Sequence, residues 1–295
     1  MTSFPKKTKS HTNTKSNKKT SMKFAAFNAQ KKSDVQIKPT KKPATKPHFY
    51  GIHAVNALLK HRPLDALALF IQEGNQNSGV DEIVTVAKNL GVAVQFAQKN
   101  RLDELCGSPQ HQGVVLSARM PALADEADLV RLLEKSDALF LVLDQITDAH
   151  NLGACLRTAS AMGVDAVILP KNQSATITPT VAKVSVGASE VVPVISVTNL
   201  ARTLEMIKKA GVFVFGTALD ETAVLSECCD FSGKVAIVMG SEGDGMRRLT
   251  ATLCDTLVMI PMANNPDRPQ SLNVSVATGM MLYEVTRQRR LKVDV

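Results

Sequence analysis

Residues 138–143 read Ala-Leu-Phe-Leu-Val-Leu (ALFLVL), an uninterrupted apolar run that decides the class of fold. A strand with one face in solvent carries polar residues at every second position, whereas a strand covered on both faces is apolar throughout. Further mostly apolar runs occur at 165–169 (DAVIL), 191–197, 212–216 (VFVFG), 234–239 and 256–260. The runs predict a sheet with helices on both faces, which is an α/β fold.

Helices are predicted between these strands. Asn151 is placed to cap a helix over 152–162, and Asn199 is placed to cap one over 200–210. An asparagine side chain suits this position because it accepts hydrogen bonds from the free amides of the first helical turn. A glycine follows each of the two helices and can take the left-handed conformation that ends them. Further helices are expected at 180–187 and 274–289.

Upstream of these strands, the chain predicts a smaller α/β domain. Apolar residues have helical spacing over 51–60 (GIHAVNALLK). The elements expected next are a strand at 66–71, a helix at 80–90, a strand at 92–96, a helix at 100–106 and a strand at 113–118. We therefore divide the chain into a tail (1–46), a small substrate-binding domain (47–121), a linker (122–137) with a helix at 126–135, and a larger domain (138–295).

The positive charge of the protein lies in the tail. The whole chain has a net charge of +8, but residues 1–46 hold 13 Lys and one acidic residue, Asp34, so the tail has +12 and the other 249 residues −4. Its abundance of polar residues and shortage of branched apolar ones predict disorder. We interpret the tail as an electrostatic tether to a polyanion such as RNA. The alternatives are a solubilising extension and a transit peptide, the latter disfavoured because the first Arg is Arg62.

The composition disfavours several other classes of protein. Aromatic residues make up 4%, with no Trp, which argues against nucleic-acid binding on exposed stacking faces. The five Cys include no C-x-x-C pair, which argues against a disulfide framework or zinc site and predicts a cytoplasmic location. No apolar run is long enough to span a bilayer, and no apolar segment follows the basic N-terminus as in a secretory signal. We expect neither a metal nor a membrane partner.

Two segments of the larger domain place polar residues directly after a predicted strand. The segment 151–158 (NLGACLRT) puts Asn151 at a strand-to-helix turn and Arg157 about two turns further on. The segment 239–245 (MGSEGDG) holds Glu242 in a loop with three glycines. Glycines permit positive φ angles and close approach of the backbone to a ligand. The loop lacks the G-x-G-x-x-G pattern and the P-loop Lys, which argues against a nicotinamide or nucleoside triphosphate site.

A third polar segment lies near the end of the chain. In 271–279 (SLNVSVATG), Ser271 and Asn273 precede a helix of small residues that could approach a ligand closely. Each of the three segments alone is also compatible with an ordinary capped helix or tight loop. All three, however, lie beyond the carboxyl ends of strands, where open α/β sheets bind their ligands. Together they predict one ligand site.

At these segments the chain resembles the SpoU (TrmH-type) branch of the SPOUT RNA methyltransferases. The motifs N-L-G-A-C-L-R-T, G-S-E-G-D-G and S-L-N-V-S-V-A-T-G occur in the order of that family, and the resemblance covers about residues 48–295. It is greatest to the bacterial members that methylate a guanosine 2′-OH of large-subunit ribosomal RNA. The resemblance implies a deep trefoil knot in the C-terminal domain, S-adenosylmethionine as cofactor, an active site at a homodimer interface and an RNA-binding first domain.

The resemblance also assigns residues to the site. The catalytic residues are expected to be Asn151, Arg157, Glu242, Ser271 and Asn273. The cofactor loops are expected to contribute Thr217, Gly240, Ile260, Met262 and Leu272. The segment 264–270 (NNPDRPQ) is a few residues longer than in near relatives and lies beside a cofactor loop, so it leaves the choice of substrate open.

The implied reaction explains why these residue types are present. An in-line attack by a ribose hydroxyl requires a site that orients the hydroxyl and eases the loss of its proton. The family assigns this activation to Arg157, but a guanidinium is a poor base because it stays protonated. We therefore expect Arg157 to clamp the adjacent phosphate and to stabilise the developing alkoxide. Glu242 and Asn151 are expected to orient Arg157 and the substrate.

Two alternative functions stay open at this point. One is a transfer-RNA 2′-O-methyltransferase, and the other is a non-catalytic RNA-binding factor in ribosome assembly. The intact Arg157, Glu242 and Asn273 favour an enzyme. The separate first domain favours ribosomal RNA over transfer RNA, by analogy alone.

Overall fold

The computed structural model describes residues 46–263, 267 and 271–293, with the exception of residue 221. The predicted disordered tail (1–46) therefore lies outside the described residues, apart from Lys46, as does the segment 264–270 apart from Asp267. None of the helices in the described part of the chain combines the length and the apolarity needed to cross a membrane.

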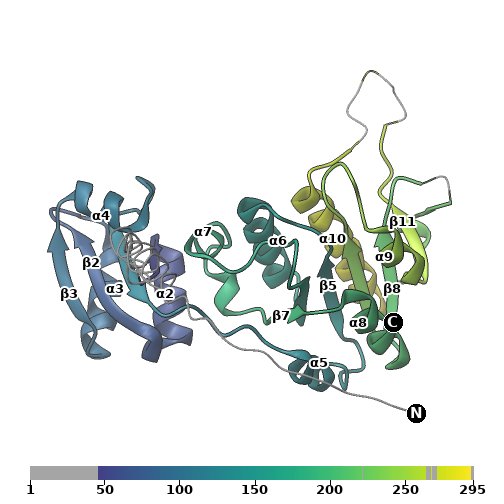
Figure 1. Cartoon of the computed structure of the whole chain (residues 1–295), viewed down its shortest axis with the longest axis horizontal. Coiled ribbons are helices and arrows are strands. Elements are labelled where there is room, and N and C mark those ends of the chain that lie inside the picture. The colour runs from purple at the N-terminus through teal and green to yellow at the C-terminus, as the bar shows by residue number, and fades with distance from the viewer. Residues whose placement is uncertain (1–45, 221, 264–266, 268–270, 294–295) are drawn as a thin grey trace, which may run out of the picture. The chain divides into compact units, whose positions relative to one another are not determined.

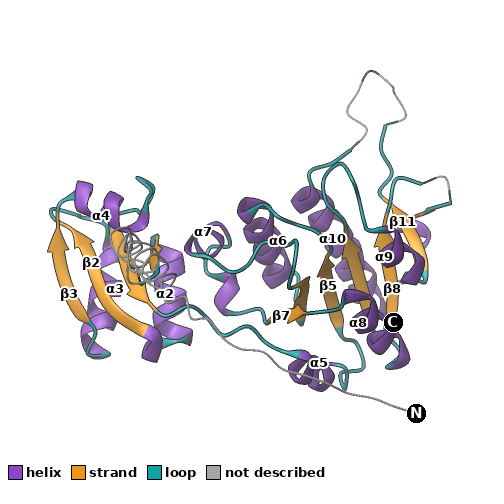
Figure 2. Cartoon of the chain, viewed as in Figure 1, coloured by secondary structure: helices purple, strands orange, loops and turns teal. Residues whose placement is uncertain are grey.

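The larger sheet has seven parallel strands in the order β7-β6-β5-β10-β8-β11-β9 (Figure 2). Its strands are β5 (Leu139–Leu143), β6 (Ala166–Pro170), β7 (Val194–Val197), β8 (Phe213–Thr217), β9 (Val224–Leu225), β10 (Val235–Met239) and β11 (Thr256–Met259). All except β9 overlap predicted strands, and the predicted α/β class is confirmed. With two residues, β9 is too short to leave a hydropathy pattern.

Alternate residues of the strands enter two separate cores, which explains the continuous apolar runs. Leu139, Leu141 and Leu143 of β5 belong to one core, whereas Phe140 and Val142 belong to the other. The first core is covered by α6 (Ala149–Ala161), α7 (Pro179–Val184) and α10 (Val274–Val293), and the second by α5 (Glu126–Leu132) and α8 (Leu200–Lys209) (Figure 1). Each fully buried leucine contributes about 1.5–3 kcal/mol to folding. The two cores therefore hold the strands in place, and with them the strand ends near which the site lies.

Helix α6 corrects one sequence-based prediction. It begins at Ala149, and its N-cap is Asp148, whose carboxylate accepts a hydrogen bond from the backbone N–H of Asn151 at 2.8 Å. Asn151 therefore lies inside the first turn, and its side chain does not cap the helix. The same prediction was right for Asn199, which caps α8 by accepting from the backbone N–H of Arg202 at 3.1 Å.

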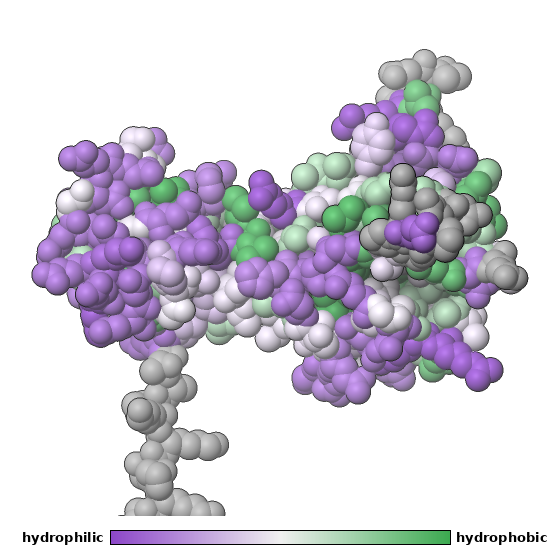
Figure 3. All heavy atoms as spheres, turned by 90° about the horizontal axis from the view of Figure 1, so that it is seen from above, coloured by the Kyte–Doolittle hydropathy of each residue, from purple (hydrophilic) through white to green (hydrophobic). Residues whose placement is uncertain are grey.

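The smaller sheet is mixed, with the order β1-β4-β2-β3. Its strands are β1 (His48–Tyr50), β2 (Ala66–Gln72), β3 (Ala93–Ala97) and β4 (Val114–Ala118). The helices α2 (Ile52–His61) and α3 (Ser78–Asn89) pack on one face, and α4 (Lys99–Cys106) packs on the other. The elements follow the predicted order for the small α/β domain, with β1 as an addition. Figure 3 shows that hydrophilic residues predominate on the face of the molecule seen there.

The segment between the two sheets contributes to the larger one. Ala124 donates a backbone hydrogen bond to the carbonyl of Val194 at 3.0 Å, and Leu129 and Leu133 enter the core beneath α8. The predicted linker (122–137) thus supplies core residues. The predicted domain boundaries stay predictions, as does the trefoil knot.

Candidate active site

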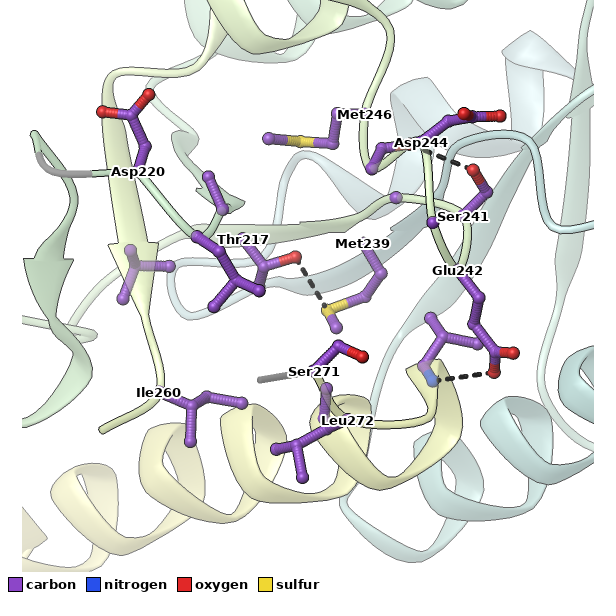
Figure 4. A pocket seen from close by; sticks show the side chains of 18 of the residues that line it. Thr217, Asp220, Met239, Ser241, Glu242, Asp244, Met246, Ile260, Ser271 and Leu272 are labelled. Atoms are coloured by element: carbon purple, nitrogen blue, oxygen red, sulfur yellow. Dashed lines mark hydrogen bonds between the residues drawn. The ribbon is translucent and has the colours of Figure 1, made fainter. Parts of the chain in front are cut away.

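A pocket of about 720 Å³ opens at the carboxyl ends of β8, β10 and β11, beside the start of α10 (Figure 4). Small-molecule sites typically have volumes of about 300–1,000 Å³. The pocket is lined by all five residues predicted to bind the cofactor, namely Thr217, Gly240, Ile260, Met262 and Leu272. Because β10 lies between β5 and β8, the strand order departs here from the order along the chain, and ligand sites of open α/β sheets occur at such points.

The floor of the pocket is formed by side chains from the ends of β8 and β10. The hydroxyl of Thr217 donates to the carbonyl of Val238 at 3.1 Å and lies 3.7 Å from the sulfur of Met239. Figure 4 shows the side chains of Thr217, Met239 and Ser271 converging in the pocket. The Thr217 hydroxyl keeps a lone pair with which it can accept a hydrogen bond from a ligand.

The loop that follows β10 folds back on itself. The backbone N–H of Ser241 donates to the carbonyl of Gly245 at 2.9 Å, and the N–H of Gly245 donates to the carbonyl of Ser241 at 3.1 Å. Gly243 and Gly245 have φ angles of +93° and +68°, which confirms the predicted positive φ angles. Gly240 serves a different purpose, because a Cβ there would lie 2.2 Å from the carbonyl carbon of Gly245. Its close approach is therefore to the loop's own backbone.

Glu242 on this loop joins the three predicted motifs. Its Oε1 accepts hydrogen bonds from Nδ2 of Asn151 at 3.1 Å, from the backbone N–H of Val274 at 3.2 Å, and from Nδ2 of Asn273. The Nδ2 of Asn273 also lies 3.0 Å from Oδ1 of Asn151. Three of the five predicted catalytic residues thus form one polar cluster at the mouth of the pocket.

Ser271 and Asn273 have different surroundings. Asn273 directly precedes α10, and its Oδ1 accepts from the backbone N–H of Ser275 in the first turn at 2.9 Å. Ser271 lies two residues earlier and lines the pocket. Both residues are exposed at the pocket mouth. They are therefore accessible to a substrate that is larger than the pocket.

Arg157 does not join this cluster within one chain. It lies exposed on α6 and does not line the pocket, and its side chain makes no hydrogen bond or ion pair with another described residue. The neighbouring Thr158 faces α10, since a Cβ on Gly279 would meet its methyl group at 3.9 Å. Arg157 itself is exposed on α6, a helix that shares its core with α10, and its guanidinium lies in solvent.

The pocket wall is negatively charged. Among its described lining residues, Asp220, Glu242 and Asp244 are acidic and none is basic. Hydrogen bonds from the hydroxyl and then the backbone N–H of Thr222, at 2.6 and 2.7 Å, lower the pKa of Asp220. Asp220 is therefore ionised at neutral pH, and the wall favours a ligand that carries positive charge.

A buried ion pair that the sequence patterns did not reveal lies behind the loop. Asp144 follows β5 and its side chain is fully buried, with Oδ1 at 2.6 and 2.8 Å from two guanidinium nitrogens of Arg247. Its Oδ2 accepts from the backbone N–H of Arg247 at 3.0 Å. A signal was present, because Asp144 is a charged residue directly after the apolar run of β5.

The cysteines lie outside this chemistry. All five are free thiols. Burial raises the pKa of Cys155 to about 11 and that of Cys254 to about 12, so neither is a thiolate nucleophile at neutral pH. Within the described residues, no group of three or more His, Cys, Asp or Glu side chains could hold a metal ion.

The chain is similar to known proteins over both of its sheets. Residues 138–283 match the model of the SpoU rRNA Methylase family, and residues 49–124 match the model for RNA 2′-O ribose methyltransferase substrate binding. A relative from Acinetobacter baylyi is 50% identical over 244 residues, which are 82% of this chain and 97% of the relative. A relative from Shewanella oneidensis is 46% identical, over 82% of this chain and 97% of the relative. Both are named 23S rRNA (guanosine-2′-O-)-methyltransferase RlmB.

Solved structures show the same similarity. The SpoU methyltransferase AviRb from Streptomyces viridochromogenes, in complex with the cofactor AdoMet, has a TM-score of 0.66 and 25% identity, covering 82% of this chain and 90% of that one. The crystal structure of an RNA 2′-O ribose methyltransferase has a TM-score of 0.68 and 26% identity, covering 82% of this chain and 88% of that one. The similarity thus extends over more than four fifths of the chain.

Proposed function

The chain belongs to the SpoU rRNA methylase family, and from this we propose that it transfers a methyl group from S-adenosylmethionine to the 2′-OH of a guanosine in large-subunit ribosomal RNA. The names of the two relatives given above state that they methylate 23S rRNA. The observation that carries the proposal is the cluster of Asn151, Glu242 and Asn273 at the pocket mouth, because it unites all three motifs. A transfer-RNA substrate and a non-catalytic role are not favoured by any of these findings.

The pocket fits the cofactor in size and charge. S-adenosylmethionine carries a sulfonium and an ammonium group against one carboxylate, and the acidic wall complements its net positive charge. Thr217, the backbone at Gly240, and the apolar Ile260, Met262 and Leu272 would hold it. When bound, the cofactor supplies an electrophilic methyl group.

The residues of the chain orient the RNA and stabilise charge on the attacking oxygen. Glu242 fixes the side chains of Asn151 and Asn273 through shared hydrogen bonds, and Ser271 and Asn273 hydrogen-bond the ribose at the mouth. Arg157 has a free guanidinium that clamps the adjacent phosphate and stabilises the developing alkoxide. Much of the rate then comes from orientation.

The exposed face of α10 supports a homodimer. Val276, Met280 and Tyr283 are 51%, 44% and 59% exposed, and their spacing places them on one face of the helix. A contiguous apolar stripe of this kind is typical of protein interfaces, and we propose that a second copy of the chain covers it. Because α6 and α10 share one core, Arg157 on α6 would lie near that interface.

The first domain and the tail would bring the RNA to the site in the cytoplasm, where the ribosomal RNA is present. The small sheet coincides with the segment that matches the substrate-binding model. The Lys-rich tail adds affinity for phosphates without sequence preference. The five free cysteines suit a reducing compartment.

The proposal is tested by mapping methylated riboses. Ribosomal RNA from a strain that lacks the gene should be methylated in vitro by the purified protein with labelled S-adenosylmethionine, at one guanosine 2′-OH of the large-subunit RNA. Transfer RNA from the same strain is the control substrate. Label on a base or on transfer RNA alone, or an absence of label, would overturn the proposal.

A further inference from the structure

Asp144 holds both ends of the loop that carries Glu242. At the start of the loop, the backbone N–H of Asp144 donates to the carbonyl of Met239, the last residue of β10, at 2.8 Å. At its end, the Asp144 carboxylate accepts from the backbone N–H of Arg247 at 3.0 Å and pairs with the Arg247 guanidinium at 2.6 Å. Asp144 thus contacts the residues on both sides of the segment 240–246, Met239 and Arg247.

Within the loop, the side chain of Met246 packs against the second core of the sheet, and the polar contacts of the other loop residues are few. The hydrogen bonds between the backbones of Ser241 and Gly245 close the loop on itself and do not join it to another element. Glu242 reaches α6 and α10 only through its exposed side chain. The polar attachment of the loop to β5 therefore depends on Asp144 and Arg247.

The charge of Asp144 makes this attachment specific. A fully buried carboxylate is tolerated only with a well-placed cation and satisfied hydrogen bonds. Arg247 supplies two guanidinium N–H groups and one backbone N–H, a planar arrangement that a lysine cannot reproduce. The guanidinium is therefore held in one place, and with it the residue at which the loop ends.

We propose that Asp144 and Arg247 are a positioning pair that holds the 240–246 loop in its cofactor-binding shape. This inference rests on the proposed function, because the loop forms the wall of the S-adenosylmethionine pocket. Neither residue lines the pocket. Both act through the loop, and through Glu242 on the cluster with Asn151.

A second ion pair of the same sheet provides a matched control. Lys208 and Asp255 pair at 2.8 Å, and the carboxylate of Asp255 accepts from the backbone N–H of Val214 at 2.8 Å. This pair lies at the amino ends of β8 and β11, the edge opposite the pocket. A variant of Asp255 loses an ion pair and a backbone hydrogen bond of the same kind, at a partly exposed carboxylate that does not contact the loop.

The experiment measures S-adenosylmethionine affinity by calorimetry for the full chain and the variants Asp144→Asn, Arg247→Lys and Asp255→Asn. Asp144→Asn places its side-chain NH2 group against an N–H donor of Arg247. Arg247→Lys keeps the positive charge but loses the planar set of guanidinium donors. We expect both to weaken cofactor binding by about tenfold or more, and the apparent Michaelis constant for the cofactor to rise. Asp255→Asn should bind as the wild type does.

The outcomes separate this inference from the proposed function. Wild-type affinity in folded Asp144→Asn and Arg247→Lys proteins would overturn the positioning role, as would an equal loss in Asp255→Asn. If Asp144→Asn does not fold, Arg247→Lys decides alone, because it keeps the buried carboxylate neutralised. A wild-type protein that does not bind S-adenosylmethionine would instead refute the proposed function.

Discussion

The side-chain amide of Asn273 donates a hydrogen bond to the amide oxygen of Asn151 at 3.0 Å, although 122 positions separate them in the sequence. Asn151 lies in the first turn of α6, near the start of the larger domain, and Asn273 directly precedes the last helix. Glu242 accepts from both amides. The polar cluster therefore combines residues from α6, from the loop after β10 and from the segment before α10. The Glu242 carboxylate is their common hydrogen-bond acceptor.

Replacing the Glu242 carboxylate should disrupt this cluster. In Glu242→Ala, no side-chain oxygen is left to accept from the donors of Asn151, Asn273 and Val274, so the two amides lose their common partner. We expect single-turnover methylation to fall by about 10–100-fold, because a misplacement of about 1 Å can have that effect. Quench-flow measurement with saturating cofactor and RNA checks the rate. Glu205→Ala, at an exposed residue of α8, is the control, and an unchanged rate in Glu242→Ala would contradict the assigned role.

A methyl group at position 240 should abolish cofactor binding by deforming the loop. In Gly240→Ala, the Cβ would lie 2.2 Å from the carbonyl carbon of Gly245 and 2.3 Å from the backbone nitrogen of Met246, neither of which can move without opening the loop. Calorimetry should detect no S-adenosylmethionine binding to the folded variant. The control is Gly163→Ala, where a φ of +73° is unfavourable for alanine but the space around the Cβ is open. It should lose about 1–2 kcal/mol of stability and keep its affinity.

The contrast between Asn199 and Asn151 shows how far local patterns predict the fold. Both residues follow a predicted strand and precede a helix, and the capping prediction was right for Asn199 and wrong for Asn151. Asp148 takes the cap of α6, and the Asn151 side chain instead hydrogen-bonds Glu242, which lies 91 positions away. A local window contains two suitable capping residues and no information on the distant carboxylate. Capping patterns therefore fail where a residue is recruited by the site.

The strands were more predictable than the contacts between them. The apolar run of β5 predicts a strand because both of its faces are buried, and that is a local property. The pairing of Asp144 with Arg247 joins positions 103 apart, and it depends on the insertion of β10 beside β5. The motifs themselves identified the candidate site by resemblance. The geometry that unites three of its residues, and leaves Arg157 outside, required the structure.

If the apolar stripe on α10 is the dimer interface, a charge introduced there should separate the two copies of the chain. Met280→Lys places a charge in the middle of the face formed with Val276 and Tyr283, and a buried unpaired charge opposes association. Light scattering after gel filtration should find the wild type at twice the mass of one chain and the variant at one. Val130→Lys, which changes a residue of α5 that is 51% exposed, should leave the mass unchanged. A monomeric wild-type protein would refute the proposed homodimer.

Removal of the Lys-rich tail should weaken RNA binding and reduce its dependence on salt. Residues 1–45 carry 12 Lys and one acidic residue. Each phosphate contact that is lost should lower the slope of log affinity against log salt by about 0.7–0.9. Filter binding of the full and truncated chains over a range of salt concentrations measures both slopes. The melting temperature of the truncated protein serves as the control for folding, and equal slopes would exclude the tether.

Arg157 provides the last prediction, because its guanidinium has no partner among the described residues. If Arg157 is only a solvated helix residue, Arg157→Ala should leave the methyl-transfer rate unchanged. A phosphate clamp that also stabilises the developing alkoxide predicts that Arg157→Ala and Arg157→Lys both lose most of the methyl-transfer rate, since lysine keeps the charge but not the planar pair of donors. Cofactor affinity should stay unchanged, because Arg157 does not line the pocket.

The kinetic form of the loss separates the two parts of this role. Stabilisation of the transition state lowers the turnover number at saturating RNA, whereas a contribution to binding alone raises the Michaelis constant for RNA. Single-turnover methylation of ribosomal RNA by the folded variants therefore decides the question, with Arg202→Ala on α8 as the control for loss of an exposed arginine. If Arg157→Ala reacts at nearly the wild-type rate with saturating RNA, the guanidinium contributes nothing at the reacting oxygen. The polar cluster around Glu242 must then orient the hydroxyl without it.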